Sequence, residues 1–146
     1  MRISYNFAVG PSASMDVRKK LQIHNALIKE CQLSGPSSRI SAKMRKTLED
    51  LSKEQRRQVA DESHEGCTAL FLASKNGAAE IVGFLVRVCH ADIEKKGRYE
   101  VLEEGVSHHV TPLWCAAVAG RLAVVKVLIG HGADVNTASD SGWRSR

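Results

Sequence analysis

The sequence predicts an all-α protein that repeats a helix-turn-helix unit and carries one long β-loop between two of the units. Its 146 residues are 43% hydrophobic but only 5% aromatic, which suits helices packed through Leu, Val, Ile and Ala better than a β-sandwich. Apolar residues recur at steps of three and four, as on one face of an α-helix. A segment that begins at Thr68 returns 43 positions later at Thr111. Together these observations predict a solenoid of packed helices.

The first part of the chain predicts a tail followed by three helices. Residues 1–15 contain Gly10, Pro11 and several serines without a sustained period, so we expect a disordered tail. Apolar residues are then spaced as on two helices, and Ser52 predicts the start of a third that runs to about Asp61. The two stripes are Val17, Leu21, His24, Ile28 and Cys31, and Ile40, Met44, Leu48 and Leu51. Candidate N-caps of the first two helices are Asp16 and either Ser38 or Ser41. We expect residues 16–62 to form a degenerate, helical N-terminal repeat.

Two clear repeats follow within residues 63–142, at 65–94 and 110–136. The threonines, leucines and glycines of segments 68–77 and 111–120 coincide at a spacing of 43, and Ile81-Val82 aligns with Val124-Val125. The threonines are candidate helix N-caps, and Pro112 suits the first helical position. Gly77 and Gly120 permit a left-handed turn between two helices. Each repeat is therefore predicted to be a helix-turn-helix unit.

The order Thr-Pro-Leu, Gly, Val-Val-Leu and Gly-Ala-Asp-Val-Asn resembles the ankyrin repeat, which has about 33 residues. The longer spacing here places an insertion at residues 95–109. In this finger Tyr99 and Val101 alternate with charged residues and Glu104-Gly105 is a candidate turn, so we expect a β-hairpin over the concave face. The predicted fold class is an all-α ankyrin-repeat solenoid with one long β-loop finger.

The repeat pattern stops after Gly142, and we expect residues 143–146 to be an aberrant or truncated end of an incomplete array. An array without a C-terminal cap would expose the apolar face around Val124, Val127 and Leu128.

Charge and hydropathy argue against nucleic-acid and membrane partners. The chain has 21 basic and 16 acidic residues, with the basic excess in its first half. These charges alternate with acidic residues, and no aromatic residue lies between Lys19 and Val59 to stack on bases, so solvated helix faces are favoured. The longest apolar stretch, residues 113–119, is too short to cross a bilayer, and the N-terminus lacks the order of a secretory signal. We expect a protein of the cytosol or nucleus.

The sequence does not predict an enzyme, a metal or a cofactor. The four cysteines are widely spread without a C-x-x-C pair, and we expect them to be buried. His108 and His109 lie near Glu103 and Glu104, but adjacent histidines on a strand point to opposite faces, and no third ligand has a diagnostic spacing. No Gly-rich phosphate loop and no Gly-x-Ser-x-Gly elbow is present. A non-catalytic binding module is therefore expected.

Across residues 16–142 the sequence resembles the feminization (Fem) ankyrin proteins, the substrate receptors of cullin-RING ubiquitin ligases. The resemblance rests on the degenerate N-terminal repeat, on the enlarged acidic finger, and on the motifs Val88-Cys89-His90-Ala91-Asp92-Ile93-Glu94 and Pro112-Leu113-Trp114-Cys115-Ala116-Ala117. It implies that a groove on the concave face binds C-terminal degron peptides, in many cases with arginine, for ubiquitination and proteasomal degradation. It also implies that cullin-RING subunits join only the full-length protein. In this family an acidic residue of the long finger reads the arginine, and Glu103 or Glu104 is the nearest match, with Glu100 a third option.

The residues of the finger are chemically suited to that role. A guanidinium in a partly dry groove prefers one or two carboxylates and an aromatic face beside it. The candidate peptide-binding residues are Tyr99, Glu100, Glu103, Glu104 and Trp114. The alternatives are that the glutamates are solvated loop charges and that Trp114 packs between repeats. Lys75 and Arg121 could meet a peptide carboxylate or serve solubility. The alternative function is that of a generic ankyrin protein-protein interaction scaffold.

Overall fold

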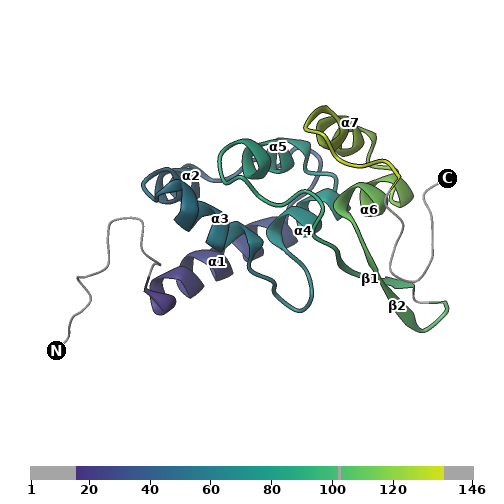
Figure 1. Ribbon diagram of the computed structural model, residues 1–146, viewed down its shortest axis with the longest axis horizontal. Helices are drawn as coiled ribbons and strands as arrows, with labels where there is room; N and C mark the ends of the chain where they lie inside the picture. The colour runs from purple at the N-terminus through teal and green to yellow at the C-terminus, as the bar shows by residue number, and fades with distance from the viewer. Residues whose placement is uncertain (1–15, 102, 137–146) are drawn as a thin grey trace.

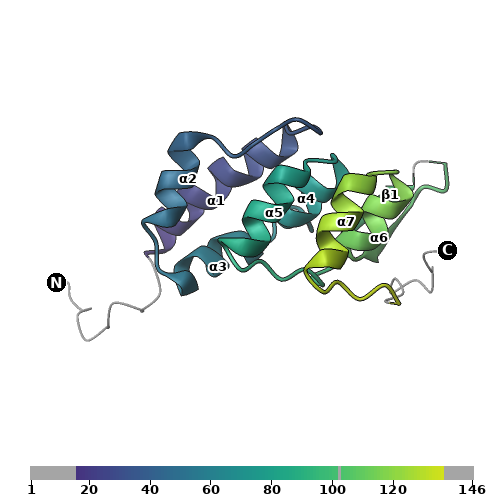
Figure 2. The same ribbon diagram turned by 90° about the horizontal axis from the view of Figure 1, so that it is seen from above.

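The computed structural model describes residues 16–101 and 103–136, which form helices in two layers with one projecting hairpin (Figure 1). The elements in chain order are α1 (Val17–Gln32), α2 (Ala42–Glu49), α3 (Lys53–Asp61), α4 (Ala69–Lys75), α5 (Ala79–Arg87), β1 (Gly97–Val101), β2 (Val106–Val110), α6 (Pro112–Val118) and α7 (Leu122–Gly130). Helices α1, α4 and α6 lie side by side in one layer, and α5 and α7 lie side by side in the other (Figures 1 and 2). The predicted stack of helix-turn-helix units with one β-loop finger is confirmed. The predictions for residues 1–15 and 143–146 lie outside the described residues.

The helix starts follow the predicted capping chemistry. Thr68 Oγ1 accepts a hydrogen bond from the Phe71 amide at 3.2 Å, and Thr111 Oγ1 accepts one from the Trp114 amide at 3.2 Å. Ser41 caps α2 by accepting a hydrogen bond from the Met44 amide at 3.1 Å. Asp16 stands at the N-cap position of α1, but its side chain makes no capping hydrogen bond.

Left-handed turns join the two helices of each clear repeat. The backbone φ angle is +79° at Gly77 and +74° at Gly120. Glycine adopts such angles without a Cβ penalty, so each helix pair can reverse direction there. The predicted role of both glycines is confirmed.

The buried stripe of α1 differs from the prediction. Val17 and Leu21 are exposed, whereas Ile23 and Leu27 are buried beside the predicted His24, Ile28 and Cys31. The reason is that α3 and α4 contact the side of α1 that carries Leu27. Helical spacing alone does not show on which side of α1 the neighbouring helices pack.

The apolar interior is divided into two clusters. The larger one joins α1 through α7 and contains the fully buried residues Leu27, Leu48, Leu85 and Leu128. The smaller one contains Phe71, Val110, Trp114 and Cys115. Because these four residues come from α4, β2 and α6, the smaller cluster fixes the base of the hairpin to both repeats.

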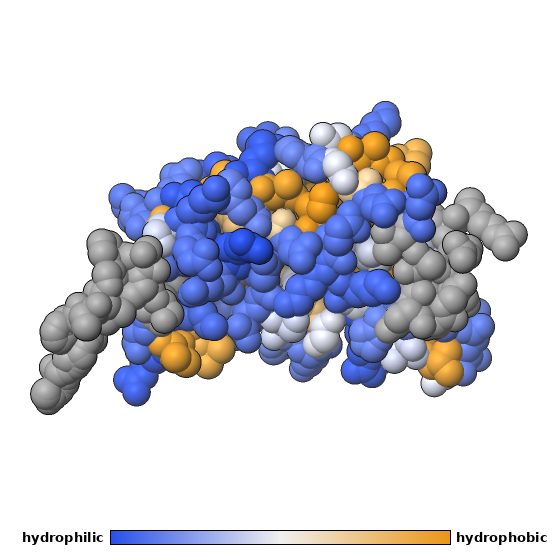
Figure 3. Space-filling model, in the orientation of Figure 1, coloured by the Kyte–Doolittle hydropathy of each residue, from blue (hydrophilic) through white to orange (hydrophobic). Residues whose placement is uncertain are grey.

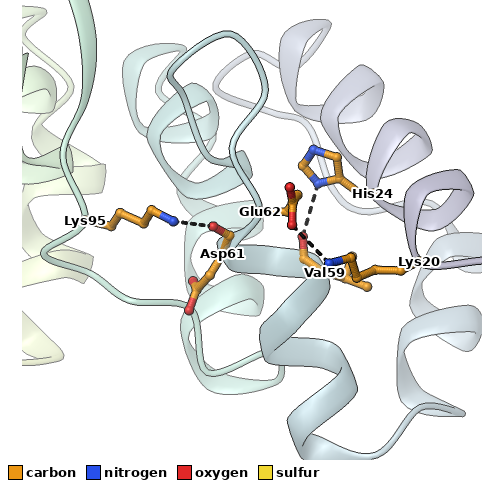
Figure 4. A network of polar contacts seen from close by, with 6 residues as sticks. All are labelled: Lys20, His24, Val59, Asp61, Glu62 and Lys95. Carbon is orange, nitrogen blue, oxygen red and sulfur yellow. Dashed lines mark hydrogen bonds and ion pairs between the residues drawn. The ribbon is translucent and has the colours of Figure 1, made fainter. Parts of the chain in front are cut away.

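A polar network links α1 and α3 to the start of the finger (Figure 4). Lys95 Nζ donates to the Asp61 carbonyl at 2.6 Å, and the Asp61 carboxylate accepts from the Asp92 amide at 2.9 Å. Lys20 pairs with Glu62 at 3.1 Å. His24 is buried with its Nδ1 3.2 Å from the Val59 carbonyl, and burial lowers the pKa of His24. These contacts orient the finger relative to the N-terminal helices.

Two of the basic residues in the first half of the chain are engaged within the fold. Arg56 donates from Nε to the Leu48 carbonyl at 2.9 Å, where α2 ends, and from a terminal nitrogen to the Val88 carbonyl at 3.3 Å, where α5 ends. The Arg45 guanidinium lies 4.8 Å from the centre of the Phe84 ring. These arginines join helices α2, α3 and α5.

Candidate functional site

The finger is an antiparallel hairpin in which Tyr99 pairs with His108 and Glu100 pairs with Ser107. Gly105 has a φ of +66° in the turn, as the predicted Glu104-Gly105 turn requires. Successive residues of a strand point to opposite faces, so Tyr99 and Glu100 lie on different sides of the hairpin. The five predicted site residues therefore do not form one cluster.

Tyr99 and Trp114 lie together on the inner side of the hairpin. Their ring centres are 5.6 Å apart in an edge-to-face arrangement. Trp114 is only 4% exposed and packs in the smaller cluster, while Tyr99 is half-buried against it. Because β2 leads directly into α6, the first turn of α6 is held against the hairpin base. Trp114 thus occupies the packing position, and the prediction of an open aromatic face at Trp114 is corrected.

Glu103 and Glu104 lie at the exposed end of the hairpin. Glu104 is near His108, with 3.6 Å between Oε1 and Nε2. His108 is buried and His109 is exposed, as expected for neighbours on a strand. Neither glutamate lines the cavity to which Glu100 belongs.

That cavity, named here the charged groove, has a volume of about 230 Å³ and lies between the end of α1, the loop before α4, the helix α4 and the strand β1. Its residues are Gln32, His64, Glu65, Cys67, Leu72, Lys75, Arg98 and Glu100. It therefore combines two carboxylates, two permanent cations and one histidine around a partly apolar wall.

Backbone hydrogen bonds hold both walls of the charged groove in place. His64 and Cys67 exchange two backbone hydrogen bonds of 2.8 and 3.0 Å, and Glu65 has a φ of +52° in the turn between them. The Arg98 amide donates to the Gly66 carbonyl at 3.1 Å, so this loop pairs with the edge of β1. The loop from His64 to Cys67 thus lies directly beside the long finger.

The charges of the groove are accessible to an incoming ligand. Arg98 and Glu100 form an ion pair of 2.8 Å, with both side chains about half exposed. An ion pair at that exposure contributes about 0.2–1 kcal/mol, so either partner can be exchanged for a ligand group at little cost. Glu65 is more open still, with 81% of its side chain exposed and His64 3.8 Å away. The arrangement can receive a ligand that carries charges of both signs.

The cysteines do not add reactivity to the groove. Burial raises the pKa of Cys31, Cys89 and Cys115 to about 12. Cys67 is half-buried, burial raises its pKa, and its Sγ donates to the Arg98 carbonyl at 3.6 Å. The expectation of buried cysteines is confirmed for three of the four.

Of the candidates from the sequence, Glu100 and Lys75 line the charged groove. Arg121 does not, because its Nε donates to the Lys75 carbonyl at 3.1 Å and its side chain lies over Gly77, joining the two inter-helix turns.

Sequence reasoning missed Gln32, His64, Glu65 and Arg98 as residues of the charged groove. A signal existed for Arg98, because strand alternation places it on the same strand face as Glu100.

Two negative findings concern only residues 16–101 and 103–136. No three His, Cys, Asp or Glu side chains in these ranges are grouped so that they could hold a metal ion. No helix there has both the length and the apolar composition to cross a membrane.

Comparison with known proteins identifies the repeats. A family model described as ankyrin repeats in three copies matches residues 39–139. Protein fem-1 homolog CG6966 of Drosophila melanogaster is 39% identical over 74 residues, which cover 51% of this chain and 11% of that protein. Glycerophosphocholine phosphodiesterase GDE1 of Candida albicans is 34% identical over 83 residues, 57% of this chain and 6% of that protein. Ankyrin repeat and KH domain-containing protein mask of Drosophila melanogaster is 34% identical over 84 residues, 58% of this chain and 2% of that protein.

The chain thus spans 11% or less of the length of these relatives. The family match, in contrast, covers more than half of the chain and includes α2 through α7. The chain therefore belongs to the ankyrin-repeat family, whose members are generally non-catalytic modules that bind other proteins.

Proposed function

We propose that this chain is the substrate-recognition ankyrin module of a cullin-RING ubiquitin ligase and that its charged groove binds arginine-containing C-terminal degron peptides. The observation that carries the proposal is the placement of Glu65 and Glu100 in one cavity with Lys75 and Arg98. The Fem-like motifs of the sequence and the 39% identity to a fem-1 homolog support it. The proposal transfers the arginine-reading role from Glu103 and Glu104 to Glu100, because Glu100 lines the groove.

The two carboxylates suit a guanidinium group. Arginine presents five donors in a planar fork that matches carboxylate oxygens, and such charge-assisted hydrogen bonds are stronger than neutral ones. The guanidinium of the peptide would replace that of Arg98 on Glu100 and reach Glu65 on the opposite wall. Leu72 supplies apolar surface beside these charges.

The two cations suit the carboxylate at the end of a peptide. Lys75 is exposed at the end of α4 and lines the groove, and Arg98 becomes available once Glu100 is occupied by the ligand. A peptide with arginine near its C-terminus would satisfy both pairs of charges at once. The chain would perform no chemistry: partner subunits would transfer ubiquitin, and the receptor would raise the local concentration of the substrate.

The test is fluorescence anisotropy of labelled peptides that end in arginine or carry arginine one position earlier, titrated with the full chain. We expect Glu100→Gln and Glu65→Gln each to weaken binding about 10- to 100-fold, the range for a lost charge-assisted hydrogen bond. Glu103→Gln is the matched control, since it removes the same charge at the exposed end of the hairpin. Equal affinities for Glu100→Gln and Glu103→Gln would contradict the assignment.

Peptide chemistry separates this function from its alternative. Amidation of the peptide C-terminus should reduce the affinity if Lys75 and Arg98 bind the carboxylate. A generic ankyrin scaffold that binds the surface of a folded protein predicts no effect of amidation. The ligase role is tested separately in cells with a reporter that ends in the bound peptide: its degradation should require cullin activity, and excess chain should lengthen its half-life by competition.

A further inference from the structure

A second groove lies between α1 and α2, with a volume of about 620 Å³. Its apolar surface comes from Ile23, Ala26, Leu33 and Met44. Ile23 and Met44 are more than nine-tenths buried and form the floor, whereas Ala26 is exposed and Leu33 is 77% exposed at the end of α1. We name this cavity the α1–α2 groove, and it shares no residue with the charged groove.

The rim of the α1–α2 groove is basic. Lys29 projects from α1 and Lys43 from α2, and both are exposed. Glu30 is the one acidic residue among those that line the groove, and both of its carboxylate oxygens are engaged. They accept hydrogen bonds from the Ser41 amide at 3.0 Å and from the Ser41 hydroxyl at 2.8 Å. These donors are neutral, so Glu30 keeps its charge, and two lysines against one glutamate leave the rim with a net charge of +1.

The shape of the groove corresponds to a helix. It follows α1 from Gln22 to Leu33, which at 1.5 Å per residue is about 16 Å. That length accommodates apolar anchors at positions i, i+3 or i+4, and i+7 of a partner helix, as in other helix-in-groove complexes.

We propose that the α1–α2 groove is a docking site for an acidic amphipathic helix of a partner protein. The apolar face of the helix would cover Ile23, Ala26, Leu33 and Met44, and its flanking carboxylates would meet Lys29 and Lys43. Charge complementarity selects the partner: a basic helix would be repelled by both lysines, and a neutral one would leave them unpaired. The site is independent of the proposed peptide function, since it lies on different residues.

The test uses a designed fluorescent peptide of about 18 residues, long enough to form a stable helix on binding, with leucines on one face and glutamates on the others. A peptide of the same composition with the leucines distributed around the helix is the ligand control. The protein variants are Ala26→Glu, which adds a negative charge at an exposed position of the groove, and the double charge reversal Lys29→Glu/Lys43→Glu. Lys126→Glu on α7 is the matched control, and circular dichroism verifies that each variant is folded.

The proposal expects saturable binding of the amphipathic peptide, an affinity about tenfold lower for the double reversal and for Ala26→Glu, and no change for Lys126→Glu. Failure of the full chain to bind the amphipathic peptide, or equal binding of both peptides, would overturn it. A dimer in analytical ultracentrifugation that Ala26→Glu dissociates would assign the groove to a second copy of the chain. Binding to phosphatidylserine vesicles, lost in the double reversal, without peptide binding would assign it to a lipid surface.

Discussion

The two clear repeats share one sequence pattern but differ in how deeply they are buried. In α5 the five consecutive residues Ile81, Val82, Gly83, Phe84 and Leu85 are all buried, whereas in α7 only Val124 and Leu128 are. Val82 is completely buried, but Val125, its equivalent 43 positions later, is partly exposed. In the first helix of each repeat, Ser74 is buried and its equivalent Ala117 is exposed.

The difference shows that neighbours decide burial in a solenoid. The pair α4–α5 contacts α1 on one side and α6–α7 on the other, while among the described helices the main contacts of α6–α7 are with α4–α5. The prediction that the apolar face around Val124, Val127 and Leu128 would be exposed is therefore partly wrong. Val124 and Leu128 are fully buried against α5, and Leu122 and Ile129 are exposed instead, at 71% and 47%. Figure 3 shows the resulting apolar surface over α7.

The largest effect on stability is expected at equivalent positions that are fully buried in both repeats. Leu85 and Leu128 occupy equivalent positions and are both fully buried, so Leu85→Ala and Leu128→Ala should each lower the free energy of unfolding by about 2–5 kcal/mol. Urea unfolding followed by circular dichroism measures both losses. A loss below about 1 kcal/mol for Leu128→Ala would mean that α7 unfolds separately from the rest, and the comparison would fail.

The finger that separates the repeats provides the next test. A Cβ atom at Gly97 would clash with the Phe71 ring, so Gly97→Ala must displace α4 or β1. Overpacking of this kind costs about 1–3 kcal/mol. Gly35→Ala is the control, because a Cβ at Gly35 meets nothing within 4 Å. If thermal unfolding shows equal stabilities for the two variants, the hairpin base is not anchored on α4.

The contrast in burial itself is tested by a pair of valines. Val82→Ala removes two fully buried methyl groups and should lower the free energy of unfolding by about 2 kcal/mol. Val125→Ala removes the same groups at a partly exposed position and should lower it by less than about 1 kcal/mol. Equal losses in urea unfolding would show that α7 is covered as fully as α5 in solution.

The smallest effect is expected for the pH dependence of the free energy of unfolding, through His24 of α1. Helix α1 is the neighbour that helps to bury α4. Burial lowers the pKa of His24 below 6.5, so the unfolded chain takes up a proton at this residue before the folded chain does. The free energy of unfolding should therefore fall as the pH drops below 6.5 and be independent of His24 above it. Unfolding of the wild type and of His24→Gln from pH 5 to pH 8 measures this contribution. A wild-type slope equal to that of His24→Gln would exclude His24 as its source.

Much of the fold could be predicted because its signals are local. Thr68 and Thr111 cap helices through atoms three residues away, and Gly77 and Gly120 permit left-handed turns through their own backbone. The hairpin follows from alternation and a turn within a short segment. The candidate site could be predicted only in part, because the charged groove combines α1, the loop before α4, α4 and β1. Glu100 and Lys75 were recognised as candidates. Their proximity to Glu65 and Arg98, however, depends on how the loop before α4 pairs with β1.

By itself, the sequence determined the helix boundaries, the repeat register and the presence of the finger, since these depend on spacing and on contacts between nearby residues. Only the tertiary structure decided which residues are covered and which charges meet. Val82 and Val125 have the same place in the repeat, yet the helices on either side of them differ. Tyr99 and Glu100 are neighbours in the chain, yet the strand directs one toward Trp114 and the other into the charged groove. The physical reason is that burial and electrostatic pairing depend on separations in space, which for residues distant in the sequence are set by how the repeats stack.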